Sequence, residues 1–271
     1  MAALIRQAWF QVLVAGAVIW AALDWATVDS RNVNLVPSLI VVGASLGPIA
    51  FTAYVYQREH TREIPAHLLL WCFIVGGALG VVAASVLEYR TVLDLGALPT
   101  LGIGLIEETC KLVVPVTIFL AAPQFRREAD GLVFGVASGL GFAAFESMGY
   151  GLTALLLSHG DIGRVEQLLF VRTVLSPAGH GAWTGLICAM LWRARERRTP
   201  AALACVPLAF VTAVILHAAW DSSIHTWQQA IVAAVSLSLL LWRIRAAAEP
   251  LRAQSLPPPP AATPVWMRTR R

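Results

Sequence analysis

The chain has few charged residues: of its 271 residues, 13% are charged and 58% are hydrophobic. Soluble domains carry roughly 25% charged residues, so an ordinary soluble enzyme is excluded. Disordered chains are poor in apolar residues, which excludes disorder for all but the ends of the chain. The composition instead indicates an all-α, polytopic helical protein of the lipid bilayer.

Lysine is almost absent and cysteine is sparse. Lys111 is the only lysine, and it lies inside an apolar segment. The arginines fall in short connections and at the C-terminus, where basic residues determine the orientation of a membrane protein. The net charge of +4 therefore does not indicate a nucleic-acid partner. No C-x-x-C pair occurs, so we interpret the cysteines as buried free thiols: Cys72, Cys110, Cys188 and Cys205.

One hydrolase motif is also missing. The chain lacks the H-E-x-x-H pattern of zinc proteases. Ser222 and Ser223 lie near His217, but we interpret them as interfacial polar residues rather than as part of a Ser–His pair. The Glu-Glu and His-x-x-x-Asp patterns each occur only once, which disfavours the repeated halves that are common in carriers.

The apolar residues form about eight runs, each near the ~20 residues that cross the hydrocarbon core as a helix. The first run lacks a clear cleavage site and is too long for a signal peptide. We expect spans at residues 7–28, 34–56, 66–87, 99–121, 131–152, 175–192, 201–222 and 227–246.

Arginine distribution predicts the orientation. Only Arg31, Arg90, Arg164 and Arg172 fall on one side of the alternating connections, which predicts that both termini are cytoplasmic and that the chain is a multi-pass plasma (inner) membrane protein. Residues 1–248 form one transmembrane domain in this interpretation. Residues 161–174 are expected to form a short amphipathic helix in the outer interface, and residues 249–271 a disordered Pro- and Arg-rich cytoplasmic tail.

Small residues recur every four positions at the start of the fifth predicted span. Gly131, Gly135 and Gly139 share one helix face. Such spacing allows two helices to pack closely in lipid. We interpret these glycines as packing residues without a chemical role.

Ionisable residues inside the bilayer are costly and therefore mark functional sites. At 1.5 Å per residue, those of four successive spans fall in the same outer half of the membrane. The sequence therefore predicts one shared polar site that is open to the outside. Its candidate residues are Glu107, Glu108, Lys111, Glu146, His180, His217 and Asp221.

Spacing places several of these residues on common helix faces. Lys111 lies four residues after Glu107 and three after Glu108, so it can pair with either carboxylate. Two adjacent carboxylates do not easily both ionise in a low dielectric, and Lys111 or a bound metal would relieve this. His217 and Asp221 are also four residues apart, which is a common way to orient a histidine.

Carboxylates combined with histidines fit the hydrolysis of an amide by an activated water. Histidine and carboxylate are zinc ligands, and a further glutamate can act as general base. Pro177 and Gly179 precede His180, so we expect a helix that is broken or only beginning there. A broken helix at membrane depth usually lines a cavity.

Four blocks of this sequence resemble the PrsW family of intramembrane proteases, within the larger superfamily of CAAX-prenyl-endopeptidase-like membrane proteins. They occur in the family's order over residues 100–222: an E-E-x-x-K pattern ending at Lys111, an F-x-x-x-E pattern ending at Glu146, a block from Arg172 to Gly185, and H-A-A-W-D from His217 to Asp221. Many family members have Glu-Asn in the second block, whereas here Ser147 follows Glu146.

The resemblance implies regulated intramembrane proteolysis of a membrane-anchored protein, such as an anti-sigma factor, near the outer membrane face. It implies that Glu107 or Glu108 activates the water. His180 and His217 would be metal ligands or would stabilise the oxyanion, and Glu146 and Asp221 would complete or orient a site for Zn²⁺. A metal-free glutamate mechanism is argued for relatives, and the residues leave both open.

Two other functions compete with this interpretation. Buried Glu and His residues also serve proton relays, so a proton- or ion-coupled transporter is the alternative. A catalytically inactive interaction protein is disfavoured, because each lost site residue would make the remaining buried charges harder to tolerate.

Overall fold

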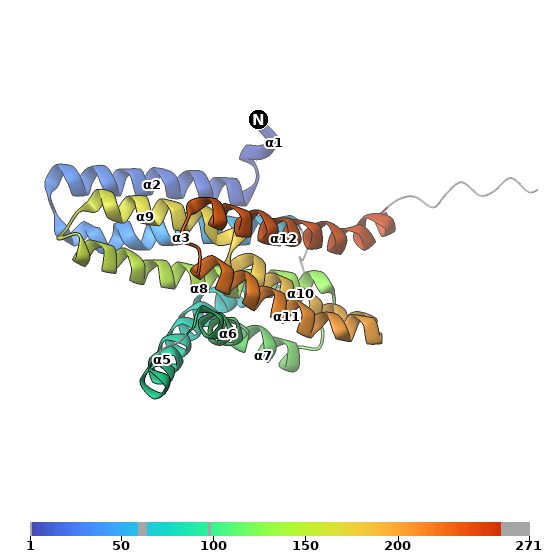
Figure 1. The fold of residues 1–271 in the computed structure, drawn as a ribbon. Helices are drawn as coiled ribbons and strands as arrows, with labels where there is room; N and C mark the ends of the chain where they lie inside the picture. Colours follow the sequence, from blue (N-terminus) through green and yellow to red (C-terminus); the bar gives the residue numbers. More distant parts are fainter. Residues whose placement is uncertain (1, 59–63, 97–98, 256–271) are drawn as a thin grey trace, which may run out of the picture.

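The computed structural model describes residues 2–58, 64–96 and 99–255, and this part of the chain is helical, with no strand. Figure 1 shows the arrangement. The helices are α1 Ala2–Ile5, α2 Ala8–Ser30, α3 Val36–Arg58, α4 Ala66–Trp71, α5 Gly77–Leu95, α6 Thr100–Lys111, α7 Val113–Ala121, α8 Glu128–Leu157, α9 Ile162–Leu175, α10 His180–Arg197, α11 Pro200–Asp221 and α12 Thr226–Ser255. Short helical turns lie at Val33–Leu35 (η1), Cys72–Gly76 (η2, a π-helix) and Ser176–Ala178 (η3).

Six helical segments of the described chain are long and apolar enough to cross a membrane. They confirm the predicted polytopic helical bundle and correspond to six of the eight expected spans. They are Ala8–Ser30, Val33–Arg58, Ala66–Asp94, Glu128–Leu157, Pro200–Asp221 and Thr226–Ala247. The other two expected spans are also helical, but each is interrupted by a break.

The break in the fourth expected span has a cause in the sequence. Pro115 has no N–H to donate to the carbonyl oxygen of Lys111, four residues earlier. The hydroxyl of buried Ser138 on α8 donates to that oxygen instead, at 2.7 Å. The segment therefore divides at Leu112 into α6 and α7, and the break directly follows Lys111 in the chain.

The break in the sixth expected span confirms that a helix begins at His180. The turn η3 contains Pro177, Gly179 follows it, and α10 starts at His180 rather than at residue 175. The preceding α9 is the amphipathic helix expected near 161–174. It does not lie across the bundle: Figure 1 shows it alongside α3 and α8, because it buries Val165 and Leu169 against them.

Helix α8 is the centre of the fold. Helix α10 packs along its first part, and α3 and α9 pack along its second part (Figure 1). The glycines predicted for packing produce the α8–α10 contact: an added Cβ at Gly131, Gly135 or Gly139 would collide with the backbone carbonyl of Cys188, Thr184 or His180, respectively. The close approach of the two backbones therefore determines the position of His180 along α8.

Substituting alanine for Gly139 is expected to destabilise the protein by about 1–3 kcal/mol, because the new methyl group would fall on the His180 carbonyl oxygen. The unfolding midpoint of the detergent-purified protein, followed by tryptophan fluorescence, measures this. Gly149→Ala on the same helix is the matched control, since no atom lies within 4 Å of its added Cβ. Equal midpoints for the two variants would contradict the packing argument.

An ion-pair cluster holds α8, α10 and α12 together at the end of α8 that is remote from the candidate site. Buried Glu128 pairs with Arg193 of α10 at 3.1 Å and with Arg243 of α12. The cluster therefore links the start of α8 to the last part of α10 and to α12. Of the four cysteines, all free, three are buried as expected and Cys205 is half-buried.

The C-terminal end of the chain was expected to form a tail over residues 249–271. Helix α12 continues to Ser255, past the residue at which the tail was expected to begin. Residues 256–271 lie outside the described residues.

Candidate active site

Helix α6 contributes two carboxylates and an ammonium group to one buried face. Lys111 Nζ lies 3.1 Å from Glu107 Oε2 and 2.8 Å from Glu108 Oε1. Lys111 and Glu108 are completely buried, and Glu107 is 8% exposed. The predicted pairing is therefore present with both carboxylates. The Lys111 ammonium group neutralises part of their negative charge, which is unfavourable inside a lipid bilayer.

Helix α11 brings His217 to the same carboxylates. Its Nδ1 lies 2.9 Å from Glu108 Oε1, and its Nε2 lies 3.5 Å from Glu107 and 3.4 Å from Asp221. A hydrogen bond from Nδ1–H to Glu108 fixes the tautomer and leaves the Nε2 lone pair directed toward Glu107 and Asp221. This arrangement of carboxylate and histidine is typical of histidines that act as bases or metal ligands.

The beginning of α10 places His180 between the two halves of the site. His180 Nδ1 lies 2.7 Å from Lys111 Nζ, and Nε2 lies 3.0 Å from Glu146 Oε2. Because an ammonium group only donates hydrogen bonds, Nδ1 accepts from Lys111 and Nε2–H donates to Glu146. An ion on His180 would therefore have to replace one of these two contacts.

Glu146 of α8 is held from the other side by Arg172 of α9. The guanidinium lies 2.7 Å from Glu146 Oε2 and donates to the Ser147 hydroxyl at 2.8 Å. It also stacks on the Tyr150 ring, at 4.2 Å from the ring centroid. Ser147 thus supports the arginine that contacts Glu146.

Aromatic side chains enclose the cluster. The Trp183 ring stacks on His217 with centroids 4.7 Å apart, and Lys111 Nζ lies 4.3 Å from the Phe142 centroid. Phe142 and Trp183 are each 1% exposed. Such apolar walls lower the local dielectric and strengthen every charge interaction within the site.

One set of residues could hold a metal ion. Ligand atoms of Glu107, His180 and His217 all lie within 4.8 Å of one another. Two imidazole nitrogens and one carboxylate oxygen form a donor set typical of catalytic zinc, which keeps a fourth position open. Glu146 and Asp221 were expected to be ligands, and in the structure each contacts a single histidine at the edge of this trio.

Every candidate residue from the sequence meets in this one region, and the structure adds others. Thr184 donates to Glu108 Oε2 at 3.4 Å, so both Glu108 oxygens are occupied. Glu88 of α5 has a buried carboxylate oxygen with no hydrogen-bond partner among the described residues, and interacts electrostatically with Glu107. Thr184 lies four residues after His180, a spacing that could have indicated it. Glu88 lies just beyond the expected span 66–87 and was missed for that reason.

Comparisons with known proteins identify the family of this chain. The model of the PrsW family of intramembrane metalloproteases matches residues 64–245. The chain is 26% identical to Protease PrsW of Bacillus subtilis (strain 168) over 207 residues, which cover 74% of this chain and 90% of that protein. It is 25% identical to Protease PrsW of Shouchella clausii (strain KSM-K16) over 213 residues, covering 74% and 92%.

No solved structure matches the chain significantly. The family match extends over more than half of the chain and contains every residue of the cluster described above. The protein is a multi-pass membrane protein whose substrates are membrane proteins. It belongs to the PrsW family and is an intramembrane protease.

Proposed function

We propose that this protein hydrolyses peptide bonds of membrane-anchored proteins near the outer membrane face, with Glu107, His180 and His217 as the reactive groups. The observation that supports this most is the convergence of these three side chains from three helices in an otherwise apolar interior. A plasma-membrane location and an anti-sigma factor as substrate are further parts of the proposal. They rest on the arginine distribution and on the family resemblance.

Glu107 is the carboxylate best placed to handle the water. Its contacts with Lys111 and His217 both use Oε2, which leaves Oε1 for the attacking water. In this mechanism Oε1 accepts a proton from the water, whose oxygen adds to the scissile carbonyl carbon. The proton then passes to the amide nitrogen as the C–N bond breaks.

The other residues hold these groups in place. Glu108, with both oxygens occupied, orients His217 and is a positioning residue. Glu146 orients His180 and is itself oriented by Arg172, and Asp221 contacts Nε2 of His217. Such contacts fix the tautomer and direction of a reacting histidine.

We further propose that the ion is Zn²⁺ and that His180, His217 and Glu107 hold it. The donor set fits zinc. When bound, zinc supplies a Lewis acid and makes a water nucleophilic at neutral pH. Glu107 keeps its role toward the water whether or not an ion is present, so the protease proposal does not depend on the metal.

Elemental mass spectrometry of the detergent-purified protein and cleavage of a co-expressed single-span substrate test the two proposals separately. In wild type we expect about one zinc per chain together with cleavage. The His180→Ala, His217→Ala double variant is expected to lose both, and His159→Ala, an exposed histidine outside the site, is expected to lose neither.

The outcomes separate the alternatives. Cleavage without metal in the wild type would overturn the zinc proposal and keep the glutamate mechanism. Unchanged cleavage in the double variant would place the reaction elsewhere. Proton-coupled uptake into vesicles without cleavage would favour the transporter.

A further inference from the structure

A groove of about 690 Å³ opens beside the active site, and two of the site residues form part of its wall. The wall comes from the second half of α8 and from α9 on one side, and from the α11 end and the α12 start on the other. Arg172 and Asp221 belong both to this wall and to the site. The remaining polar wall includes Arg164, Gln167 and Gln229.

A smaller cavity adjoins the groove on the side of the reactive groups. It has a volume of about 50 Å³ and shares Val171, Arg172 and Trp220 with the groove. Its other walls include Ser147 and His180. Since a water molecule takes about 30 Å³ in the liquid, this space is sufficient for one water. The groove therefore lies next to a cavity that reaches His180.

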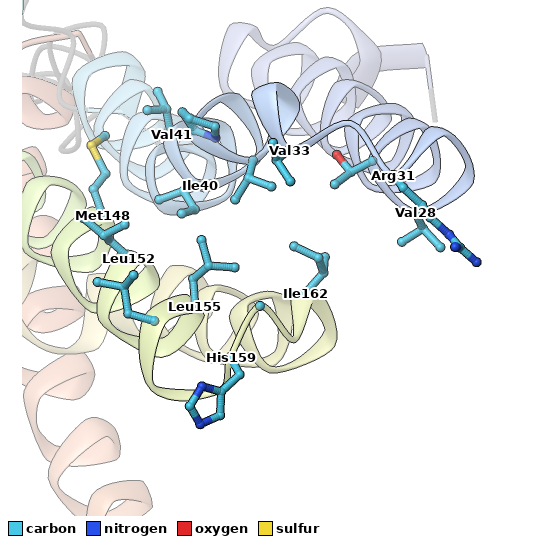
Figure 2. A pocket seen from close by; sticks show the side chains of 15 residues that line it. Val28, Arg31, Val33, Ile40, Val41, Met148, Leu152, Leu155, His159 and Ile162 are labelled. Atoms are coloured by element: carbon cyan, nitrogen blue, oxygen red, sulfur yellow. The ribbon is translucent and has the colours of Figure 1, made fainter.

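The chemistry of this groove differs from that of the larger hollow in the molecule. Figure 2 shows the latter, about 880 Å³ between α2, α3 and the α8–α9 turn, lined mainly by aliphatic side chains such as Ile40, Leu152 and Leu155. That lining suits lipid tails or an apolar helix. Amide and guanidinium groups suit an extended peptide, whose backbone N–H and C=O groups must be paired when they leave water.

Arg164 gives the polar groove a cation that a ligand can use. Arg172 is already paired with Glu146 at 2.7 Å. The ion pair of Arg164 is with Asp161 at 3.6 Å, and the Arg164 side chain is 75% exposed. An exposed pair of this kind contributes about 0–1 kcal/mol, so a substrate carboxylate can compete with Asp161 for the guanidinium.

We propose that this groove binds an extended, acidic segment of the membrane-anchored substrate next to its scissile bond, and that Arg164 recognises a carboxylate of that segment. This rests on the proposed protease function. The substrate class it defines is a membrane protein with acidic residues directly outside its span. Arg164 determines specificity in this model and takes no part in the hydrolysis.

A charge exchange tests the specificity. Two single-span test substrates that differ only in carrying a short Asp/Glu or Lys stretch outside the span are compared. Wild type is expected to cleave the acidic one about 3- to 10-fold faster, and Arg164→Glu is expected to reverse the preference. Arg90→Glu, an exposed arginine on α5 away from the groove, should keep the wild-type preference. An unchanged preference in Arg164→Glu would overturn the role of Arg164.

Cysteine crosslinking tests the groove independently of cleavage. Gln167→Cys and Gln229→Cys, each combined with Glu107→Gln, are expected to crosslink to a cysteine in the acidic stretch of the substrate. Thr91→Cys, half-buried on α5 and outside the groove, is expected not to. Crosslinking at Thr91 but not in the groove would overturn the proposal even if the wild type cleaves. Absence of cleavage by the wild type would instead count against the protease mechanism, and the crosslinks would still locate the substrate.

Discussion

Replacing Glu107 with glutamine is expected to lower the rate of substrate cleavage by roughly 10²–10⁴-fold, the range that a positioned general base contributes. Glutamine keeps the size of the side chain and can still contact His217, but it cannot accept a proton from water. Cleavage of a purified single-span substrate in detergent, followed over time at saturating substrate, measures the effect.

This experiment has to distinguish a loss of catalysis from a loss of folding. Glu107→Gln leaves Lys111 paired with Glu108 at 2.8 Å, so the variant should elute and melt as the wild type does. Glu166→Gln, which removes a half-buried carboxyl group on α9 outside the site, is the matched control and should cleave normally. A Glu107→Gln rate within threefold of wild type would assign the base to another residue.

Lys111→Met is expected to destabilise the protein by about 3–5 kcal/mol, the usual cost of removing one partner from a buried ion pair. Lys111 is completely buried and contacts Glu107, Glu108 and His180. Methionine fills a similar volume, so the loss comes from the two carboxylates that remain without their cation. Thermal or denaturant unfolding in detergent measures it.

The control for this variant is Thr109→Met on the exposed side of the same helix, which should change stability little. Zinc adds a second readout. Removing Lys111 frees Nδ1 of His180, so added zinc is expected to raise the unfolding midpoint of Lys111→Met more than that of the wild type. Wild-type stability in Lys111→Met would show that the ammonium group does not neutralise these carboxylates.

Contacts within one helix were predictable from spacing alone. The intervals of three and four residues between Glu107, Glu108 and Lys111, and between His217 and Asp221, place each pair on one face whatever the rest of the chain does. Rise per residue predicted a common depth for the polar groups in the same way. The glycine spacing of α8 predicted a close helix contact but not that α10 provides it.

Contacts between helices depend on how each helix is rotated about its axis, which spacing does not specify. The hydrogen bond between His217 and Glu108 and the pairing of Arg172 with Glu146 are of this kind. The grouping of Glu107 with His180 and His217 is a third example. The direction of α9 was missed because its amphipathic pattern suits a protein surface and a membrane surface equally well.

The order of the site residues along the chain has a consequence for synthesis. His217 is made 109 residues after its partner Glu108, an interval of about 5–20 s at typical rates of translation. During that time Lys111 is already in the same helix as the two carboxylates and reduces the charge that α6 brings into the lipid. The nascent chain thus tolerates its acidic pair early. In the proposed mechanism, which needs His217, it becomes active only when α11 is inserted, so unfinished copies would not cut neighbouring membrane proteins.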